Sequence, residues 1–224
     1  MKYILKQEEP QEVIAWKNLA NDEWQPSWNV FQNPQKQRLK ESLLEEQGFI
    51  CCYCQQRIEV DSKTEIEHII TREECDELNN EALKLEYTNL IASCEGNKPP
   101  SRHPEINESR HCNGFRGNRS LPITPLIPNC EDFFKYNFRG KIKGLNVNAQ
   151  TTIENLNLEI LEKSRESKIQ GILPDEIILS ITNNDIQILI DYYSRKSNID
   201  NDGKMKFPEY SGVIINLLRQ LDGN

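Results

Sequence analysis

The chain has 224 residues, of which 37% are hydrophobic and 28% are charged, a balance typical of a soluble globular protein. It contains no run of about 18 apolar residues, so we expect no membrane span. The opening MKYILKQEEP has too short an apolar stretch for a secretory signal, and we therefore expect a cytoplasmic protein. In that reducing compartment the seven cysteines are expected as metal ligands or buried thiols rather than as disulfides.

The net charge of −8 is spread unevenly along the chain. Residues 98–150 carry nine basic and four acidic side chains, whereas the segments 1–50, 51–97 and 151–224 are each net acidic. A local basic stretch can follow a row of phosphates even on an acidic protein. The average charge therefore does not exclude a nucleic-acid partner.

The first predicted element is a helix over residues 34–47, PQKQRLKESLLEEQ. Asn33 can cap its start, Pro34 suits the first turn and Gly48 can end it. Its apolar stripe consists of Leu39, Leu43 and Leu44. The tryptophans upstream are expected in the core or as docking anchors rather than as surfaces that stack on a ligand: Trp16, Trp24 and Trp28.

Short elements are predicted around the cysteines. Residues 49–60 suit a hairpin, residues 64–70 a strand and residues 79–87 a short helix. Several prolines mark residues 95–111 as a polar loop, in which His103 is expected to be exposed.

Beyond a proline-marked connector that starts at residue 121, the pattern becomes helical, with helices expected over residues 153–167, 185–196 and 209–221. We expect an α+β fold that is mainly helical. Its parts are an N-terminal helical segment (1–48), a central unit (49–120) and a helical C-terminal region (121–224).

The spacing Cys51-x-x-Cys54 occurs both in zinc knuckles and in thiol redox pairs. A redox pair is expected at a helix N-terminus within a thioredoxin-like βαβ pattern, which the sequence lacks. Cys94 and Cys112 complete a set of four thiolates, the number that tetrahedral Zn²⁺ prefers. We therefore expect a structural zinc at these four cysteines, with unmetallated thiols as the alternative. The remaining three are expected to be buried thiols: Cys52, Cys75 and Cys130.

Other polar residues recur in order within this cysteine frame. They are Glu67 and His68, then Asn89 and Leu90, then His111, Cys112 and Asn113. Over residues 51–119 this order resembles the HNH endonuclease family. The resemblance implies a ββα-metal unit in which a hairpin presents His68 and a helix that starts near His111 presents Asn113.

The same resemblance implies a role for each matching residue. His68 would be the general base, Glu67 the first metal ligand and Asn89 the residue that orders the loop carrying the base. Asn113 stands where many members have a third histidine, so the chain would be an H-N-N variant. Glu67 stands where an aspartate is commoner.

The chemistry of phosphodiester hydrolysis agrees with these residue types. The reaction needs an activated water, and neutral imidazole suits that task because its unperturbed pKa is about 6.5. Mg²⁺ prefers a few hard oxygen ligands, which Glu67 and the side-chain oxygen of Asn113 can provide. Mg²⁺ or Mn²⁺ is thus the expected catalytic ion, and His111 is the alternative ligand.

Four basic residues are expected to contact nucleic acid, with DNA as the expected form. Arg116 lies one turn beyond Asn113 on the expected helix and Arg119 follows it, although a solvated helix face is the alternative for both. Lys98 and Arg102, in the polar loop, are expected to touch the phosphate backbone rather than to read bases.

The flanking segments carry a narrower resemblance. The stretches KYILKQEEPQEVIAWKN, LLEEQG and TTIENLNLEILEKSRES, with the region of Trp24, look like the HNH nuclease subunit of Septu-type antiphage systems, also found as an effector in certain retron systems. That resemblance implies a defence complex with an ABC-type ATPase subunit. The C-terminal region has no catalytic signature and is expected to dock this partner, with the N-terminal tryptophan segment as the competing surface.

Two other functions stay open on the sequence alone. A non-catalytic zinc module that binds nucleic acid or a partner explains the cysteines and the basic stretch, but it gives no joint role to Glu67, His68 and Asn113. A thiol oxidoreductase requires a reactive thiol at Cys51 or Cys54.

Overall fold

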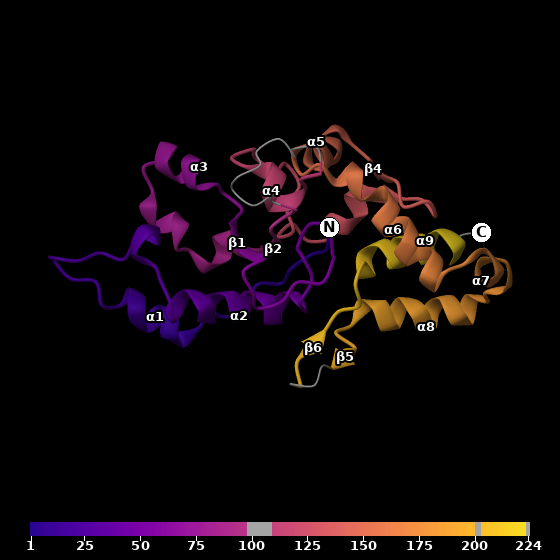
Figure 1. Cartoon of the computed structure of the whole chain (residues 1–224), viewed down its shortest axis with the longest axis horizontal. Helices are drawn as coiled ribbons and strands as arrows, with labels where there is room; N and C mark the ends of the chain where they lie inside the picture. Colours follow the sequence, from indigo (N-terminus) through magenta and orange to yellow (C-terminus); the bar gives the residue numbers. More distant parts are fainter. Residues whose placement is uncertain (98–108, 200–202, 223–224) are drawn as a thin grey trace.

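The computed structural model describes residues 1–97, 109–199 and 203–222 (Figure 1). The predicted nucleic-acid contacts Lys98 and Arg102, the exposed position expected for His103 and most of the predicted polar loop lie outside the described residues. The fold is mixed α+β and mostly helical, as expected, with small two-stranded antiparallel sheets. In the described parts of the chain, no helix is both long enough and apolar enough to cross a membrane.

The elements follow one another as short segments. The first half contains α1 (Gln11–Lys17), η1 (Trp28–Val30), α2 (Gln35–Gln47), β1 (Thr64–His68), α3 (Arg72–Glu77), η2 (Glu81–Lys84), η3 (Tyr87–Asn89), β2 (Leu90–Cys94) and α4 (Cys112–Arg116). The second half contains η4 (Cys130–Phe133), β3 (Phe134–Tyr136), β4 (Ile142–Gly144), α5 (Val147–Asn155), η5 (Leu158–Leu161), α6 (Glu162–Ile172), α7 (Asp175–Ser180), α8 (Asn183–Ser194), β5 (Asn198–Ile199), β6 (Met205–Lys206) and α9 (Ser211–Asp222).

The predicted helix over residues 34–47 is confirmed as α2. It ends at Gly48, whose φ of +62° is the left-handed conformation that glycine adopts without a steric penalty. The three predicted leucines are buried: Leu39, Leu43 and Leu44. Asn33 does not cap this helix, because Pro34 occupies the N-cap and no side-chain capping bond forms there.

The remaining predicted elements are confirmed in outline. The predicted hairpin appears as a bridge between Ile50 and Arg57, and residues 79–87 form 3₁₀ turns rather than an α-helix. The C-terminal helices are present, although residues 153–167 divide between α5, η5 and α6. The pairings β3–β4 and β5–β6 were not expected, since strands of two or three residues carry too little alternation to be recognised.

A hairpin and a helix form the centre of the molecule. β1 pairs antiparallel with β2, placing Thr64 opposite Cys94 and His68 opposite Leu90, and α4 packs against β2. In Figure 1, α2 runs below this pair of strands and α4 lies above them. The hairpin therefore lies between the predicted N-terminal segment and the short helix that follows the polar loop.

The free edge of β2 is covered by a side chain rather than by a third strand. The Gln47 amide accepts from the backbone N–H of Ala92 at 2.7 Å and donates to its carbonyl at 2.8 Å. A buried edge strand needs partners for both groups, and a glutamine amide supplies one of each. Gln47 thus fixes the end of α2 to β2.

The C-terminal region packs on the cysteine hairpin. The buried Gln55 side chain accepts from the backbone N–H of Gly212, in the first turn of α9, at 2.6 Å. Arg57 donates to the carbonyl of Phe207 at 2.6 Å. The segments predicted as separate, 49–120 and 121–224, are therefore joined through the residues that flank Cys54.

Two glycines allow the chain that leaves β2 to pack directly against α4. A Cβ added to Gly114 would lie 2.4 Å from the carbonyl oxygen of Glu95, and one added to Gly96 would lie 1.7 Å from that of His111. Gly96 also has a φ of +65°. This close approach of two backbones brings Cys94 and Cys112 together.

We expect Gly114→Ala to lower the free energy of unfolding by about 1–3 kcal/mol, because the added methyl group forces backbone apart. The variant should also retain less zinc. Gly171→Ala, in α6, is the matched control, because its Cβ would meet nothing within 4 Å. The control should gain up to about 1 kcal/mol from helix propensity. Urea unfolding of both variants checks this, and equal stabilities would contradict the close packing.

Candidate functional site

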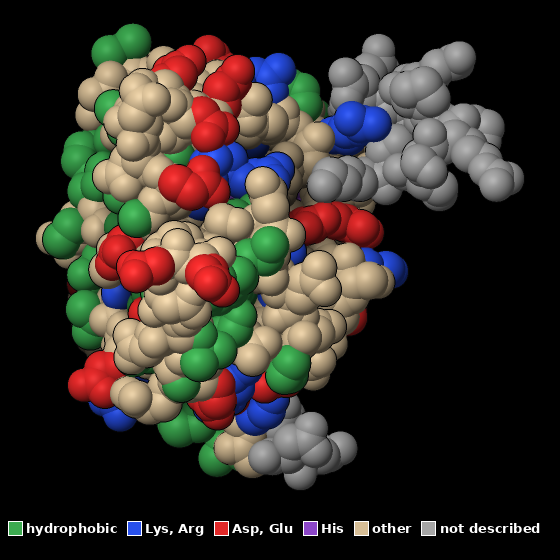
Figure 2. Space-filling model, turned by 90° about the vertical axis from the view of Figure 1, so that its left-hand side faces the viewer, with side chains coloured by type: hydrophobic (Ala, Val, Ile, Leu, Met, Phe, Trp, Pro, Cys, Tyr) green, Lys and Arg blue, Asp and Glu red, His purple; other side chains and the backbone are tan. Residues whose placement is uncertain are grey.

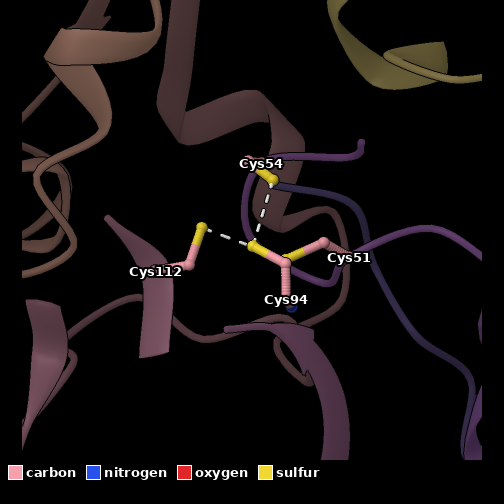
Figure 3. A group of neighbouring side chains, drawn as sticks. All are labelled: Cys51, Cys54, Cys94 and Cys112. Atoms are coloured by element: carbon pink, nitrogen blue, oxygen red, sulfur yellow. Dashed lines mark hydrogen bonds between the residues drawn. The ribbon is translucent and has the colours of Figure 1, made fainter. Parts of the chain in front are cut away.

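Four cysteine sulfurs converge from three elements. Cys51 and Cys54 lie on the hairpin after α2, Cys94 ends β2 and Cys112 begins α4 (Figure 3). All four sulfur atoms lie within 4.8 Å of one another, with 3.9 Å between Cys51 and Cys112 and 3.8 Å between Cys54 and Cys94. A tetrahedral ion with Zn–S bonds of about 2.3 Å separates its sulfurs by about 3.8 Å. The cluster is therefore compatible with a structural Zn²⁺.

The backbone around the cluster favours this arrangement. The N–H of Cys94 donates to the sulfur of Cys51 at 3.4 Å, and Cys112 adopts the left-handed conformation with a φ of +48°. His111 Nδ1 lies 3.1 Å from the sulfur of Cys112, within hydrogen-bond distance. His111 therefore lies beside the cysteine cluster, and it is not among the residues that line the cavity of Glu67 and Asn113.

The other three cysteines are not among the four that converge. Cys52, Cys75 and Cys130 are buried and free. Burial raises the pKa of the Cys52 and Cys130 thiols, which keeps them protonated at neutral pH. Neither Cys51 nor Cys54 stands at a helix N-terminus, the usual place of a reactive thiol pair.

The predicted reactive residues line one cavity of about 320 Å³ at the end of the central hairpin. Glu67 and His68 come from the last two positions of β1, and Asn113 comes from α4. The rest of the lining consists of Trp28, Lys36, Glu65, Ile66, Thr71, Arg72, Arg116, Gly117 and Asn118. The fold therefore brings Asn113 to Glu67 and His68, from which the sequence separates it by more than forty positions.

His68 is held in one tautomer. Its Nε2 lies 3.0 Å from the carbonyl oxygen of Lys84, which can only accept, so Nε2 carries the proton and Nδ1 carries the lone pair of the neutral ring. The ring of Trp28 packs nearly perpendicular to the imidazole, with 4.4 Å between centroids. Burial lowers the pKa of His68 to about 4, so the ring is neutral at pH 7.

Asn89 braces the two loops that meet at His68. Its Oδ1 accepts from the N–H of Ile70 at 2.7 Å, and its Nδ2 donates to the carbonyls of Ile70 at 3.1 Å and Leu83 at 2.9 Å. Leu83 directly precedes Lys84, whose carbonyl orients the imidazole. One buried amide thus sets the position of the loop that follows His68 and of the carbonyl that selects its tautomer.

Glu67 is enclosed by three donors. Its Oε1 accepts from Arg116 at 2.6 Å and from the Tyr53 hydroxyl at 3.1 Å, and its Oε2 accepts from the Asn113 amide at 2.6 Å. Burial raises the pKa of Glu67, and the Arg116 guanidinium acts against that rise. The two oxygens are therefore unequal, because the strongest cation is directed at Oε1 only.

Arg116 requires a correction to the expected site. We expected it on a helix face open to phosphate, but its side chain is 1% exposed. Besides Glu67, the guanidinium donates to the carbonyls of His68 and Ile69 at 2.6 Å each and to that of Arg119 at 2.9 Å. Helical spacing placed Arg116 on the same face as Asn113, but it does not reveal which strand covers that face. Arg116 anchors the end of β1.

Of the other predicted nucleic-acid contacts, Arg119 is the one that lies within the described residues. Arg119 is exposed, but its guanidinium folds back to the carbonyls of Phe115 and Arg116 at the end of α4.

Three residues of the cavity lining were not predicted for the site: Trp28, Lys36 and Arg72. Lys36 lies in the first turn of a predicted helix and Arg72 directly follows the predicted strand, yet no spacing rule connects either to His68.

Glu67 and Asn113 are the oxygen donors available for a catalytic cation. Their side chains are 2.6 Å apart and both line the cavity. Rotation of the Asn113 amide by half a turn exchanges its nitrogen for its oxygen and faces that oxygen toward Glu67 Oε2. This donor set suits Mg²⁺ or Mn²⁺, and the catalytic ion itself stays a prediction.

Comparisons with known proteins add no assignment. No model of a known protein family matches the chain, and no curated protein is significantly similar to it.

The low pKa of His68 predicts how stability depends on pH. The unfolded chain protonates His68 near pH 6.5 and the folded chain only near pH 4, so the free energy of unfolding falls as the pH is lowered between those values. The contribution is up to about 3 kcal/mol. His68→Gln removes this pH-dependent contribution to the free energy of unfolding, whereas any contribution from His111 is the same in both proteins. Urea unfolding at several pH values should therefore show a shallower dependence for the variant, and parallel curves would contradict the burial of a neutral ring.

Proposed function

We propose that the protein is a metal-dependent endonuclease of the HNH type, which hydrolyses phosphodiester bonds of DNA. One observation carries the proposal. His68, with its Nε2 proton committed to a carbonyl, shares a cavity with Glu67 and Asn113 at the end of a hairpin and helix joined by four cysteines. This arrangement corresponds to the ββα-metal unit that the sequence resemblance implied.

His68 takes the proton from the attacking water through Nδ1. Nearby positive charges on Arg72, Arg116 and Lys36 add to burial in lowering its pKa. A phosphate in the cavity supplies negative charge and moves the pKa back toward its ordinary value, which makes the imidazole a stronger base when substrate is present. The base is thus neutral before substrate arrives and more basic after it.

Glu67 and Asn113 would hold the cation, which would neutralise charge on the phosphate and on the leaving oxygen. Arg116 keeps Glu67 in place through Oε1 and leaves Oε2 directed at Asn113. Asn89 acts on the geometry of His68 without reaching the cavity lining. Each predicted site residue therefore has a separate task in the same reaction.

His68→Ala is expected to lower the rate of plasmid cleavage in Mg²⁺ or Mn²⁺ by at least about 100-fold, because a positioned general base contributes that much or more. Zinc content and circular dichroism should match the wild type, since His68 is not part of the cysteine cluster. Cleavage at the wild-type rate by a folded, zinc-loaded variant would refute the proposal.

A second candidate, a zinc module that binds nucleic acid or a partner without catalysis, is favoured by one observation. Glu67 already has three protein donors, so its carboxylate is satisfied without a cation. The same cleavage assay separates the two functions, because a binding module leaves the plasmid intact with either protein.

The proposal extends to a partner: the protein acts as the nuclease of an antiphage complex with an ABC-type ATPase. This step rests on the resemblance of the flanking segments. The helices α7 and α8 offer an apolar contact surface, since Leu179 is 88% exposed and Ile188 is 58% exposed. Removal of the whole C-terminal region would be a poor test, because α9 packs on the cysteine hairpin.

Leu179→Asp combined with Ile188→Asp should abolish co-purification with a co-expressed ABC-type ATPase partner, because a buried charge in an apolar contact is strongly unfavourable. Leu19→Asp is the control, since Leu19 is 63% exposed and lies in the N-terminal segment. Loss of the complex only in the control variant would assign docking to the N-terminal segment instead.

A further inference from the structure

The cavity has a second wall that does not belong to the hairpin and helix of the central unit. Trp28 reaches it from η1, Lys36 from the first turn of α2 and Arg72 from the start of α3. The wall lines the same cavity as Glu67, His68 and Asn113. Two of its three side chains are cations.

Neither cation of this wall forms an ion pair with a carboxylate within the residues that the structure describes. Glu65 also lines the cavity, and it is the acidic group whose charge acts most strongly on Lys36. Glu67 forms its ion pair with Arg116. Lys36 and Arg72 line the same cavity. Burial lowers the pKa of Lys36, the charge of Glu65 raises it, and the charge of Arg72 lowers it by a smaller effect. An anion between them would remove that repulsion.

Trp28 connects this pair to His68. The ammonium of Lys36 lies 4.8 Å from the centroid of the Trp28 ring, a cation–π contact that restricts the side chain. The same ring also packs against the His68 imidazole, with 4.4 Å between centroids. An anion held by Lys36 is therefore placed beside the predicted base.

We propose that Lys36 and Arg72 bind a phosphate of the DNA strand next to the scissile bond, and that Trp28 positions Lys36 for this contact. The identity of the ligand rests on the proposed nuclease function. A bidentate guanidinium and a point-charge ammonium are the groups that commonly bind phosphate. Such contacts carry no base information, so this wall sets the position of the strand and not its sequence.

The described surface on the side of the molecule that bears α1 and α3 has no broad positive field (Figure 2). Figure 2 looks at the side of the molecule that bears α1 and α3, and on its described part acidic side chains are interspersed with basic ones. Binding therefore depends on a few placed cations rather than on a broad positive field.

The test measures DNA binding without turnover. The zinc-loaded full chain is titrated into a short fluorescein-labelled DNA duplex in buffer without Mg²⁺ or Mn²⁺, and anisotropy is followed between about 50 and 200 mM salt. Lys36→Gln and Arg72→Gln should each lower the slope of log Kd against log salt by about 1, and the double variant by about 2. Lys36→Arg should keep the wild-type slope, because it retains the charge.

Arg38→Gln is the matched control. It removes the same charge from α2, but Arg38 pairs with Glu12 and Glu41 and does not line the cavity. Its slope should equal that of the wild type. Equal slopes for Lys36→Gln, Arg72→Gln and Arg38→Gln, or the absence of any DNA binding by the wild type, would overturn the inference. Because no cleavage is needed, the expected slopes support the phosphate site even if His68→Ala shows that the chain is not a nuclease.

Discussion

The convergence of four cysteine sulfurs is the interaction on which the central unit depends. A two-stranded hairpin is marginally stable by itself, and α4, with five residues, is too short to form alone. The cluster joins the hairpin of Cys51 and Cys54, the end of β2 and the start of α4 at one point. Gln47 and the C-terminal contact at Gln55 then fix this unit to the rest of the molecule. A shared metal at this point would replace the core that so small a unit lacks.

The cluster and the cavity are separate parts of one hairpin. Cys94 lies at one end of the β1–β2 ladder, paired with Thr64, and His68 lies at the other end, paired with Leu90. The predicted reactive pair, Glu67 and His68, is therefore not held by the cluster directly. Asn89 and Arg116 hold it locally, through the backbone next to His68 and through the carboxylate of Glu67.

Local sequence patterns indicated those features that depend on residues close in sequence or on a few residue types. The helix that ends at Gly48, the four cysteines and the candidate pair at residues 67 and 68 could all be read from the sequence. The burial of Arg116 could not, because helical spacing defines a face but not what packs on it. Lys36 and Arg72 were missed for a related reason. Lys36 reaches the cavity because α2 packs against β2, and long-range packing leaves no periodic signal. Arg72 lies only four residues after His68, but no helical or strand spacing connects the two.

The N-terminal segment is part of the candidate site rather than an appendage to it. Trp28 packs on the predicted base, and Lys36 extends from the same segment into the cavity. The convergence of the four sulfurs predicts that they share one zinc ion. Zinc K-edge X-ray absorption of the purified chain tests that prediction most directly. The account predicts one zinc per chain with four sulfur ligands at about 2.3 Å, and a metal-free chain or a shell of nitrogen and oxygen ligands would contradict it.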